Sequence, residues 1–301
     1  ISSSWPISRT SYKRSTIMEQ IHYYPIESCR IATIEDGDKQ TADLSVVFLH
    51  GWLDNAASFS SVMEALHQKC PQIHLCAIDL PGHGLSEHKS GSNFYQFLDY
   101  IDDVNQVLAH ISPSRLVIVG HSLGALIAGC YSAAFPEKVT ALIQIEGLKP
   151  ISEDESNVVT RLREGILSRQ RVRNKKARTL QSEQDAIALR AQINNIRADL
   201  IAPIVRRSLH LTEMSLAWRY DSKLQAQSLY RMSADQADVF QAHIQCPHLL
   251  ILGESGYSTL KVHAFDPLTS PTVETVGGGH HCHLESHIRV TELIFGLLNR
   301  I

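Results

Sequence analysis

The feature that most constrains the fold is a regular alternation of short apolar runs with longer segments of helical length. Five runs are almost continuously apolar and rich in branched side chains: residues 44–49, 73–78, 115–119, 140–145 and 249–252. Such runs are typical of parallel strands covered on both faces. Candidate helices at 56–68, 94–111 and 123–135 separate the first four. The alternation predicts an α/β fold, with a mostly parallel central sheet and helices on both faces.

Further segments extend this predicted core at both ends. Residues 21–34 are typical of an antiparallel pair at the leading edge of the sheet, and Asp36-Gly37-Asp38 supplies a turn after it. Residues 271–276 are a candidate last strand, and residues 284–299 are a candidate closing helix.

The strand pattern stops between about residues 149 and 240. This segment is rich in Arg, Gln, Leu and Ala, and Pro203 is expected to break its helical pattern. We predict an all-helical cap over 149–240, inserted into an α/β core of residues 19–148 and 241–301. Residues 1–18 are predicted to be a flexible leader, since 1–17 lack the apolar core of a signal peptide, and Met18 is a candidate start.

The composition excludes several classes of protein. The chain has 301 residues and a net charge of −3, which argues against nucleic acid as its main partner. No apolar run approaches the roughly 18 residues of a membrane span, so we expect no integral membrane association. The six cysteines include no CxxC pair, and we expect reduced thiols and a cytoplasmic location. The sequence leaves the oligomeric state open.

The motif with the clearest chemistry is Gly120-His121-Ser122-Leu123-Gly124, between a predicted strand and a predicted helix. A serine hydroxyl becomes an accessible nucleophile when it projects from a sharp strand-to-helix turn. Glycines two residues on either side permit that strained backbone. The N-terminus of the following helix also favours developing negative charge. We therefore predict that Ser122 is a nucleophile.

A nucleophile of this kind needs donors for an oxyanion on the loop after an earlier strand. Leu49-His50-Gly51-Trp52 ends such a strand. The backbone amides of Trp52 and Leu123 are the natural pair of donors for an oxyanion hole. We expect His50 to hold this loop rather than to act in catalysis.

These motifs and their order resemble the α/β-hydrolase family over about residues 20 to 300, the insert excepted. The matching segments are His50-Gly51-Trp52, residues 79–86 (DLPGHGLS), residues 120–124 and Gly279-His280. The resemblance implies that Asp79 and His83 form a turn and are not catalytic. Residues 51–55, Cys246-Pro247 and residues 279–285 are similar to the serine hydrolase-like branch of that family.

The base of such an enzyme is a histidine. Histidines 280, 281, 283 and 287 cluster after the last predicted strand, where the resemblance places the base, and Glu285 matches the family's spacing. We predict His280, with His281 as the alternative. The other interpretation of HHCHLESH is a metal site, but adjacent histidines rarely converge on one ion without a carboxylate from elsewhere, so no metal ligands are predicted.

The acid departs from the commonest pattern of the family. Gly256 stands in the loop after residues 249–252 where an aspartate is expected. A carboxylate appears one strand earlier at Glu146, and the resemblance includes branches that carry the acid there. A glutamate at an adjacent strand end can orient the imidazole. We prefer Glu146 over Glu254; its ordinary alternative role is to cap the first helix of the insert.

The insert is basic, with fifteen basic and eleven acidic side chains in residues 151–240. Its densest run comprises Arg161, Arg163, Arg169, Arg171, Arg173, Lys175, Lys176 and Arg178. A solvated helix face is the simpler interpretation. The alternative is an electropositive rim that draws anionic substrates, or a membrane surface, to the mouth of the site. Tyr257 is a further candidate to border the pocket.

Together these residues predict a serine hydrolase that cleaves a small ester-type substrate through an acyl-enzyme intermediate. The predicted triad is Ser122, His280 and Glu146, with no metal or organic cofactor. A thioesterase, a lipase or a C–C bond hydrolase with the same triad is an alternative. A weakly active ligand-binding protein on the same scaffold is another, because a displaced acid could misalign the histidine.

Overall fold

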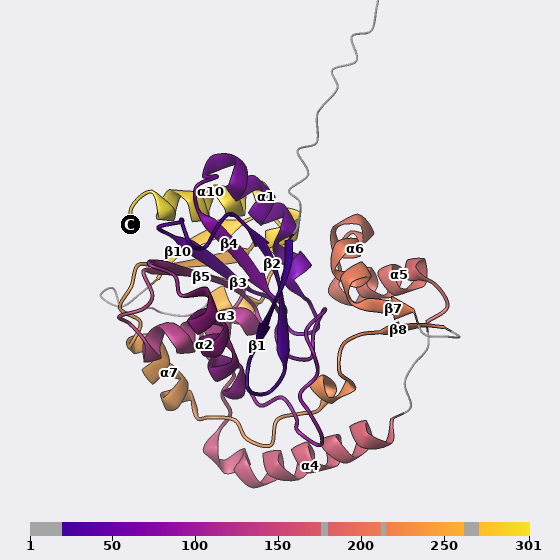
Figure 1. The fold of residues 1–301 in the computed structure, drawn as a ribbon. Coiled ribbons are helices and arrows are strands. Elements are labelled where there is room, and N and C mark those ends of the chain that lie inside the picture. The colour runs from indigo at the N-terminus through magenta and orange to yellow at the C-terminus, as the bar shows by residue number, and fades with distance from the viewer. Residues whose placement is uncertain (1–19, 176–179, 212–214, 262–270) are drawn as a thin grey trace, which may run out of the picture.

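The computed structural model describes residues 20–175, 180–211, 215–261 and 271–301. Its centre is an eight-stranded sheet in the order β1-β2-β4-β3-β5-β6-β9-β10 (Figure 1). β1 (Gln20–Pro25) pairs antiparallel with β2 (Arg30–Asp36), which pairs antiparallel with β4. The other pairings are parallel, among β3 (Ser45–Leu49), β4 (His74–Ile78), β5 (Leu116–His121), β6 (Ala141–Ile145), β9 (His248–Gly253) and β10 (Thr272–Val276).

Helices cover both faces of this sheet, which confirms the predicted α/β fold. Along β3, Val46 and Phe48 belong to one apolar core, whereas Val47 and Leu49 belong to the other. The first core lies under α1 (Ser60–Lys69) and α10 (His287–Leu298), and the second under α2 (Asp99–Ile111) and α3 (Leu123–Ala134). Burial on both faces explains the continuous apolar runs in the sequence.

Several helix boundaries differ from the prediction. A 3-10 turn, η1 (Ala56–Phe59), precedes α1, and α2 begins at Asp99 rather than at residue 94. The closing segment is divided into α9 (Cys282–Glu285) and α10, while α8 (Ser258–Lys261) is a single turn after β9.

The insert between β6 and β9 is mainly helical, with α4 (Val158–Asn174), α5 (Glu183–Asn194) and α6 (Ala198–Arg207), and the 3-10 turns η2 (Glu155–Asn157) and η3 (Ser222–Gln225). The prediction that the insert is all-helical was wrong, because the insert also contains a small sheet. β7 (Leu209–Leu211) and β8 (Leu216–Trp218) form a two-stranded antiparallel sheet. Three-residue strands are too short to show a two-residue periodicity in the sequence.

Pro203 does not break the helical pattern as expected, because it lies inside α6. Proline removes one backbone N–H and its bond to the preceding turn, which normally costs a helix about 3 kcal/mol. Here Ile201, Ile204 and Val205 are buried in an apolar cluster of the insert that also contains Ala186 of α5. Packing of this face supplies stabilisation that the sequence pattern did not reveal.

Hydrogen bonds and ion pairs join the insert to the core. Arg190 of α5 pairs with Asp54 (2.8 Å), and Arg207 of α6 pairs with Asp79 (2.8 Å). The Asn55 amide nitrogen donates to the Ile204 carbonyl and to Ser208 Oγ. In Figure 1, α5, α6, β7 and β8 form a group beside the sheet, whereas α4 runs below it.

The last helix before β9, α7 (Ala234–Ala242), packs against α3 of the core. The predicted leader, together with Lys176 and Arg178 of the basic run, lies outside the described residues. Of the helices in the described ranges, none combines the length and the apolar character that a membrane span requires.

Candidate active site

Ser122 lies on the sharp turn between β5 and α3. Its backbone has φ +50° and ψ −117°, a left-handed conformation that an L-residue rarely adopts. The Ser122 N–H donates to the Ile145 carbonyl at the end of β6 (2.9 Å), which ties the turn to the neighbouring strand. The predicted strand–turn–helix geometry is therefore present.

Glycine at position 124 permits the close approach that this turn needs. A Cβ at Gly124 would overlap the carbonyl groups of Leu49 and His50 at the end of β3. This contact brings the loop after β3 against the turn, and a Cβ at Gly51 would lie 3.3 Å from the Ser122 Cβ. The two loops that the sequence paired as a nucleophile turn and a donor loop are in contact.

A buried Glu146 and a partly buried His280 form a pair at the same edge of the sheet. Glu146 follows β6 with φ +51°, and its carboxylate is fully buried. Its oxygens accept from the Gly253 N–H (2.8 Å) and the Tyr257 N–H (3.0 Å), and His280 Nδ1 lies 3.3 Å from Oε2. Burial alone would raise the pKa of Glu146, but these hydrogen bonds outweigh it and lower the pKa below its usual value.

Gly256 explains how a glutamate on β6 reaches the position where the family pattern expects an aspartate. A Cβ at Gly256 would overlap the Glu146 carboxylate. The missing side chain at 256 therefore leaves the volume that the Glu146 carboxylate fills. In the sequence, the glycine at 256 and the glutamate at 146 are two separate departures from the family pattern. The fold places these two residues against each other.

The two alternative residues have other surroundings. Glu254 is exposed, and its backbone N–H donates to the Val276 carbonyl. His281 is buried, and its Nε2 lies 3.1 Å from Asp54 Oδ2. The carboxylate paired with His280 is therefore Glu146, while the carboxylate paired with His281 is Asp54.

Ser122 Oγ and the His280 ring are not joined in this state. Among the described residues, no hydrogen bond links them. His280 is nevertheless tied to the turn, because His121 Nε2 lies 2.8 Å from the His280 carbonyl oxygen. Catalytic hydrogen bonds are often long before substrate is bound and shorten in the substrate complex.

His121 sits in a group of four imidazoles behind this edge. Its ring centroid lies 4.8 Å from that of His280, 5.1 Å from that of His281 and 4.1 Å from that of His283. Burial, reinforced by the neighbouring imidazoles, holds the pKa of His121 and of His283 well below the usual value, so both rings are neutral.

The predicted oxyanion donors lie on the turn of Ser122, in the case of Leu123, and on the loop that contacts it, in the case of Trp52. Leu123 is the first residue of α3, so its N–H has no acceptor within the helix. Trp52 follows Gly51, and its indole N–H donates to the Leu224 carbonyl of the insert (3.0 Å). His50 holds the loop as expected, because its Nε2 accepts from the Leu80 N–H (2.9 Å).

The turn at residues 79–86 also has the structural role that was expected. Asp79 accepts from the N–H groups of Ala56 (2.7 Å) and Leu85 (2.8 Å), and His83 Nδ1 lies 3.1 Å from the Pro81 carbonyl. Glu285 accepts from the Gly279 N–H (2.6 Å), which fixes the glycine run before His280.

Tyr257 contributes more than the border position suggested by the sequence. Its ring lies 4.2 Å from the His280 ring, centroid to centroid, and its backbone N–H donates to Glu146. Its side chain is about half exposed. No local pattern marks this role, because it depends on a loop between β9 and α8.

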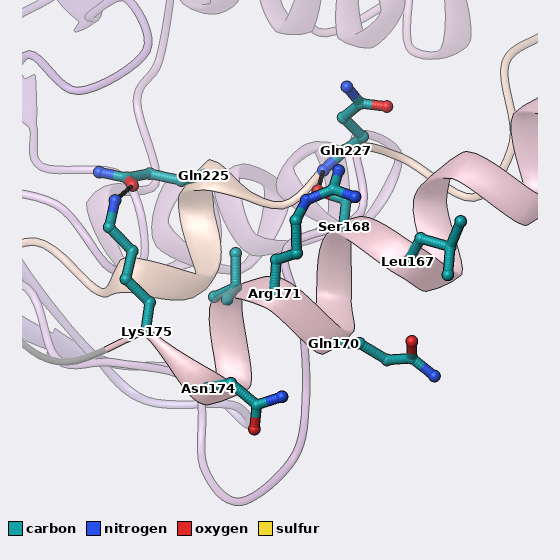
Figure 2. Close-up of a pocket in the computed structure, with 9 residues that line it drawn as sticks. Leu167, Ser168, Gln170, Arg171, Asn174, Lys175, Gln225 and Gln227 are labelled. Atoms are coloured by element: carbon teal, nitrogen blue, oxygen red, sulfur yellow. Dashed lines mark hydrogen bonds between the residues drawn. The ribbon is translucent and has the colours of Figure 1, made fainter.

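A pocket of about 800 Å³ lies elsewhere, between α4 and η3. Figure 2 shows Arg171 and Lys175 extending from α4 toward Gln225 and Gln227. None of the predicted site residues lines it. The neighbouring Arg169 and Arg173 stack over the Phe94 ring, so part of the basic run packs against the core.

Comparisons with known proteins agree with this architecture. A family model described as the alpha/beta hydrolase fold matches residues 45–256. The chain is 26% identical over 267 residues to a serine hydrolase-like protein of Danio rerio, covering 84% of this chain and 81% of that protein.

Two solved structures are similar along nearly the whole chain. A hypothetical protein from Pseudomonas aeruginosa PAO1 has a TM-score of 0.83 and 26% identity, covering 93% of this chain and 99% of that one. A thioesterase domain from the curacin biosynthetic pathway has a TM-score of 0.78 at 19% identity, covering 92% and 99%, and supports the fold alone. Since the family model spans more than half of the chain, the chain belongs to the α/β-hydrolase fold family, in its serine hydrolase-like branch.

Proposed function

We propose that this protein hydrolyses a small ester by two successive acyl transfers, with Ser122 as nucleophile, His280 as general base and Glu146 as the orienting acid. The observation that carries this proposal is the contact of the buried Glu146 carboxylate with the partly buried His280 ring beside the strained turn of Ser122. An ionised carboxylate can only accept hydrogen bonds. It therefore keeps the proton of the neutral His280 ring on Nδ1. The lone pair of Nε2 is then available for the Ser122 hydroxyl.

In the first step, Ser122 Oγ attacks the ester carbonyl carbon and its proton passes to His280 Nε2. The developing oxyanion would be held by the Trp52 and Leu123 amides. The C–O bond to the alcohol then breaks, and the alcohol leaves with the proton from His280. In the second step, water loses a proton to His280 and attacks the acyl carbon. The bond from that carbon to Ser122 Oγ then breaks, His280 returns the proton to Oγ, and the carboxylic acid leaves.

Thioester hydrolysis is the second candidate reaction. The same triad would attack a thioester carbonyl and release a thiol. Esters remain our first proposal. An alkoxide leaving group needs a proton as it departs, and His280 can supply that proton.

Replacing the nucleophile tests the proposal directly. Ser122→Ala should abolish turnover of short p-nitrophenyl esters and covalent labelling by a fluorophosphonate probe, while thermal stability changes little at a half-buried position. Matched acyl esters and acyl thioesters of increasing chain length would separate the two candidate reactions. Retention of both turnover and labelling in the variant would exclude Ser122 as the nucleophile.

A weakly active binding protein is the outcome that competes with an enzyme. Saturable binding of an ester without a burst of acylation in the wild-type protein would favour it.

For the location, we propose a reducing compartment such as the cytoplasm, supported by six cysteines that are all free thiols.

A further inference from the structure

A second group of chemically active side chains lies directly behind the proposed triad. Asp54, His121 and His281 each offer one donor atom, and these three atoms lie within 4.8 Å of one another. All three residues are buried. Their elements are remote in sequence, since Asp54 follows β3, His121 ends β5 and His281 precedes α9.

The two distances from Asp54 Oδ2 to the imidazole nitrogens are close to those between ligand atoms of a metal site. His281 Nε2 lies 3.1 Å from Asp54 Oδ2, and His121 Nδ1 lies 3.9 Å from the same oxygen. A tetrahedral Zn²⁺ bound about 2.0–2.2 Å from each ligand separates its ligand atoms by about 3.3–3.6 Å. Shifts of a few tenths of an ångström in these two pairs would reach that geometry.

An unpartnered lone pair points to a ligand for this group. His121 Nδ1 is buried and has no hydrogen-bond partner among the residues that the structure describes. Because His121 Nε2 faces the carbonyl oxygen of His280, which can only accept, Nε2 carries the proton and Nδ1 has a free lone pair. A buried acceptor of this kind costs free energy unless a cation or donor fills it.

The surroundings resemble the outer shell of metal-binding histidines. A ligating imidazole usually donates its other N–H to a carbonyl or a carboxylate, as His121 does to His280. Arg190 pairs with Asp54 Oδ1 (2.8 Å), which orients the carboxylate and leaves Oδ2 toward the two rings. The charge of Arg190 offsets that of Asp54, so we expect weaker binding than in a structural zinc site.

We propose that Asp54 Oδ2, His121 Nδ1 and His281 Nε2 form a binding site for a divalent transition-metal ion such as Zn²⁺, with water as a fourth ligand. Two imidazoles and one carboxylate favour zinc and its neighbours over magnesium or calcium. The ion would replace the hydrogen bond between His281 and Asp54, and the proton on Nε2 would be released or moved to Nδ1.

This site is separate from the proposed ester hydrolysis and does not depend on it. Two of its ligands are chain neighbours of the proposed triad: His121 precedes Ser122, and His281 follows His280. The adjacent histidines of HHCHLESH do not converge on an ion by themselves. The fold adds a carboxylate from one loop and a third ligand from the nucleophile motif.

Binding is tested on the full chain without a histidine tag, by titrating Zn²⁺ against a chromophoric chelator. We expect one ion per chain in the wild type. Affinity should fall at least about tenfold in Asp54→Asn, His121→Gln and His281→Gln, because each variant removes a ligand. His67→Gln is the matched control, since His67 pairs with Asp36 at a partly buried site that offers one imidazole and one carboxylate.

X-ray absorption at the zinc edge of the wild-type complex provides a measurement that needs no variant to fold. Two imidazoles and additional oxygen ligands would support the site. Any of three results would overturn the site: no stoichiometric binding, a zinc ion with one imidazole ligand or none, or the same affinity in folded His281→Gln as in the wild type. Neither measurement uses ester turnover, so a failed Ser122 prediction would leave this test intact.

Discussion

At the scale of single residues, the site combines two strained backbone positions. Ser122 and Glu146 both have φ near +50° without being glycine. Such conformations cost on the order of 1–3 kcal/mol each and persist where surrounding structure holds them. Here the Ser122 N–H bonds to β6 and the Glu146 N–H bonds to the Ile251 carbonyl of β9 (3.0 Å). The central strands thus fix the directions of both side chains.

The identity of the acid is the first prediction at this scale. Glu146→Gln should lower kcat on the order of 10⁴-fold, because an amide can donate to Nδ1 and favour the wrong tautomer of His280. Glu254→Gln is the matched control and should leave kcat unchanged, since Glu254 is exposed. Ester hydrolysis by the two variants measures the difference. A larger loss in Glu254→Gln would assign the acid to that residue.

Gly256 provides a second residue-scale prediction. Gly256→Ala should reduce both kcat and stability, because its Cβ would overlap the Glu146 carboxylate. Overpacking of this kind typically costs about 1–3 kcal/mol. Gly296→Ala in α10 is the control: nothing lies within 4 Å of its added Cβ, and a helical alanine should stabilise by about 0.5–1 kcal/mol. Chemical unfolding and ester assays of both variants would check this; an unaffected Gly256→Ala enzyme would contradict the packing argument.

At the scale of elements, the insert is held by two carboxylates of the core, of which the sequence assigned one, Asp79, only to a turn. Asp79 shapes its own turn and also binds Arg207 of α6, and Asp54 binds Arg190 of α5. Both carboxylates are buried at the core side of the contact. The position of α5 and α6 therefore depends on charge pairs that are shielded from solvent.

Arg207→Ala should destabilise the protein by about 3–5 kcal/mol, because it leaves the Asp79 carboxylate buried and unpaired. The adjacent Arg206→Ala should cost less than about 1 kcal/mol, because Arg206 and Glu183 form an exposed pair. Urea unfolding of the two variants compares a buried and an exposed ion pair within one helix. Equal losses would show that the Arg207–Asp79 pair does not hold the insert.

At the scale of the whole molecule, the fold buries several histidines in neutral form. Burial lowers the pKa of His50 to about 4, of His83 to about 3 and of His248 to about 4. In the unfolded chain these groups titrate near 6.5. Between those values the unfolded state binds more protons than the native state, so stability decreases as pH falls.

We therefore expect the free energy of unfolding to fall as the pH is lowered from about 6.5 toward 4, by about 1.4 kcal/mol per pH unit for each such histidine. Chemical unfolding at a series of pH values measures the slope. His248→Gln should reduce it, whereas His22→Gln at an exposed position should not. A stability that is constant or rises over this range would contradict the prediction.

The parallel sheet and the nucleophile turn could be predicted from the residues alone, because both depend on local patterns. Continuous apolar runs at residues 44–49 and 115–119 mark doubly covered strands, and the glycines around Ser122 mark a backbone that must bend sharply. The choice of Glu146 and His280 as partners came from motif order, and the structure pairs these two side chains.

Features that depend on contacts between distant segments could be found only in the folded chain. The match of Gly256 to Glu146, the ion pairs of α5 and α6 with Asp54 and Asp79, and the meeting of Asp54 with His121 and His281 all join residues far apart in sequence. The strands β7 and β8 were missed because three residues carry too little periodicity. A sequence pattern involves residues that are close along the chain, whereas packing and charge pairing act between residues that are close in space.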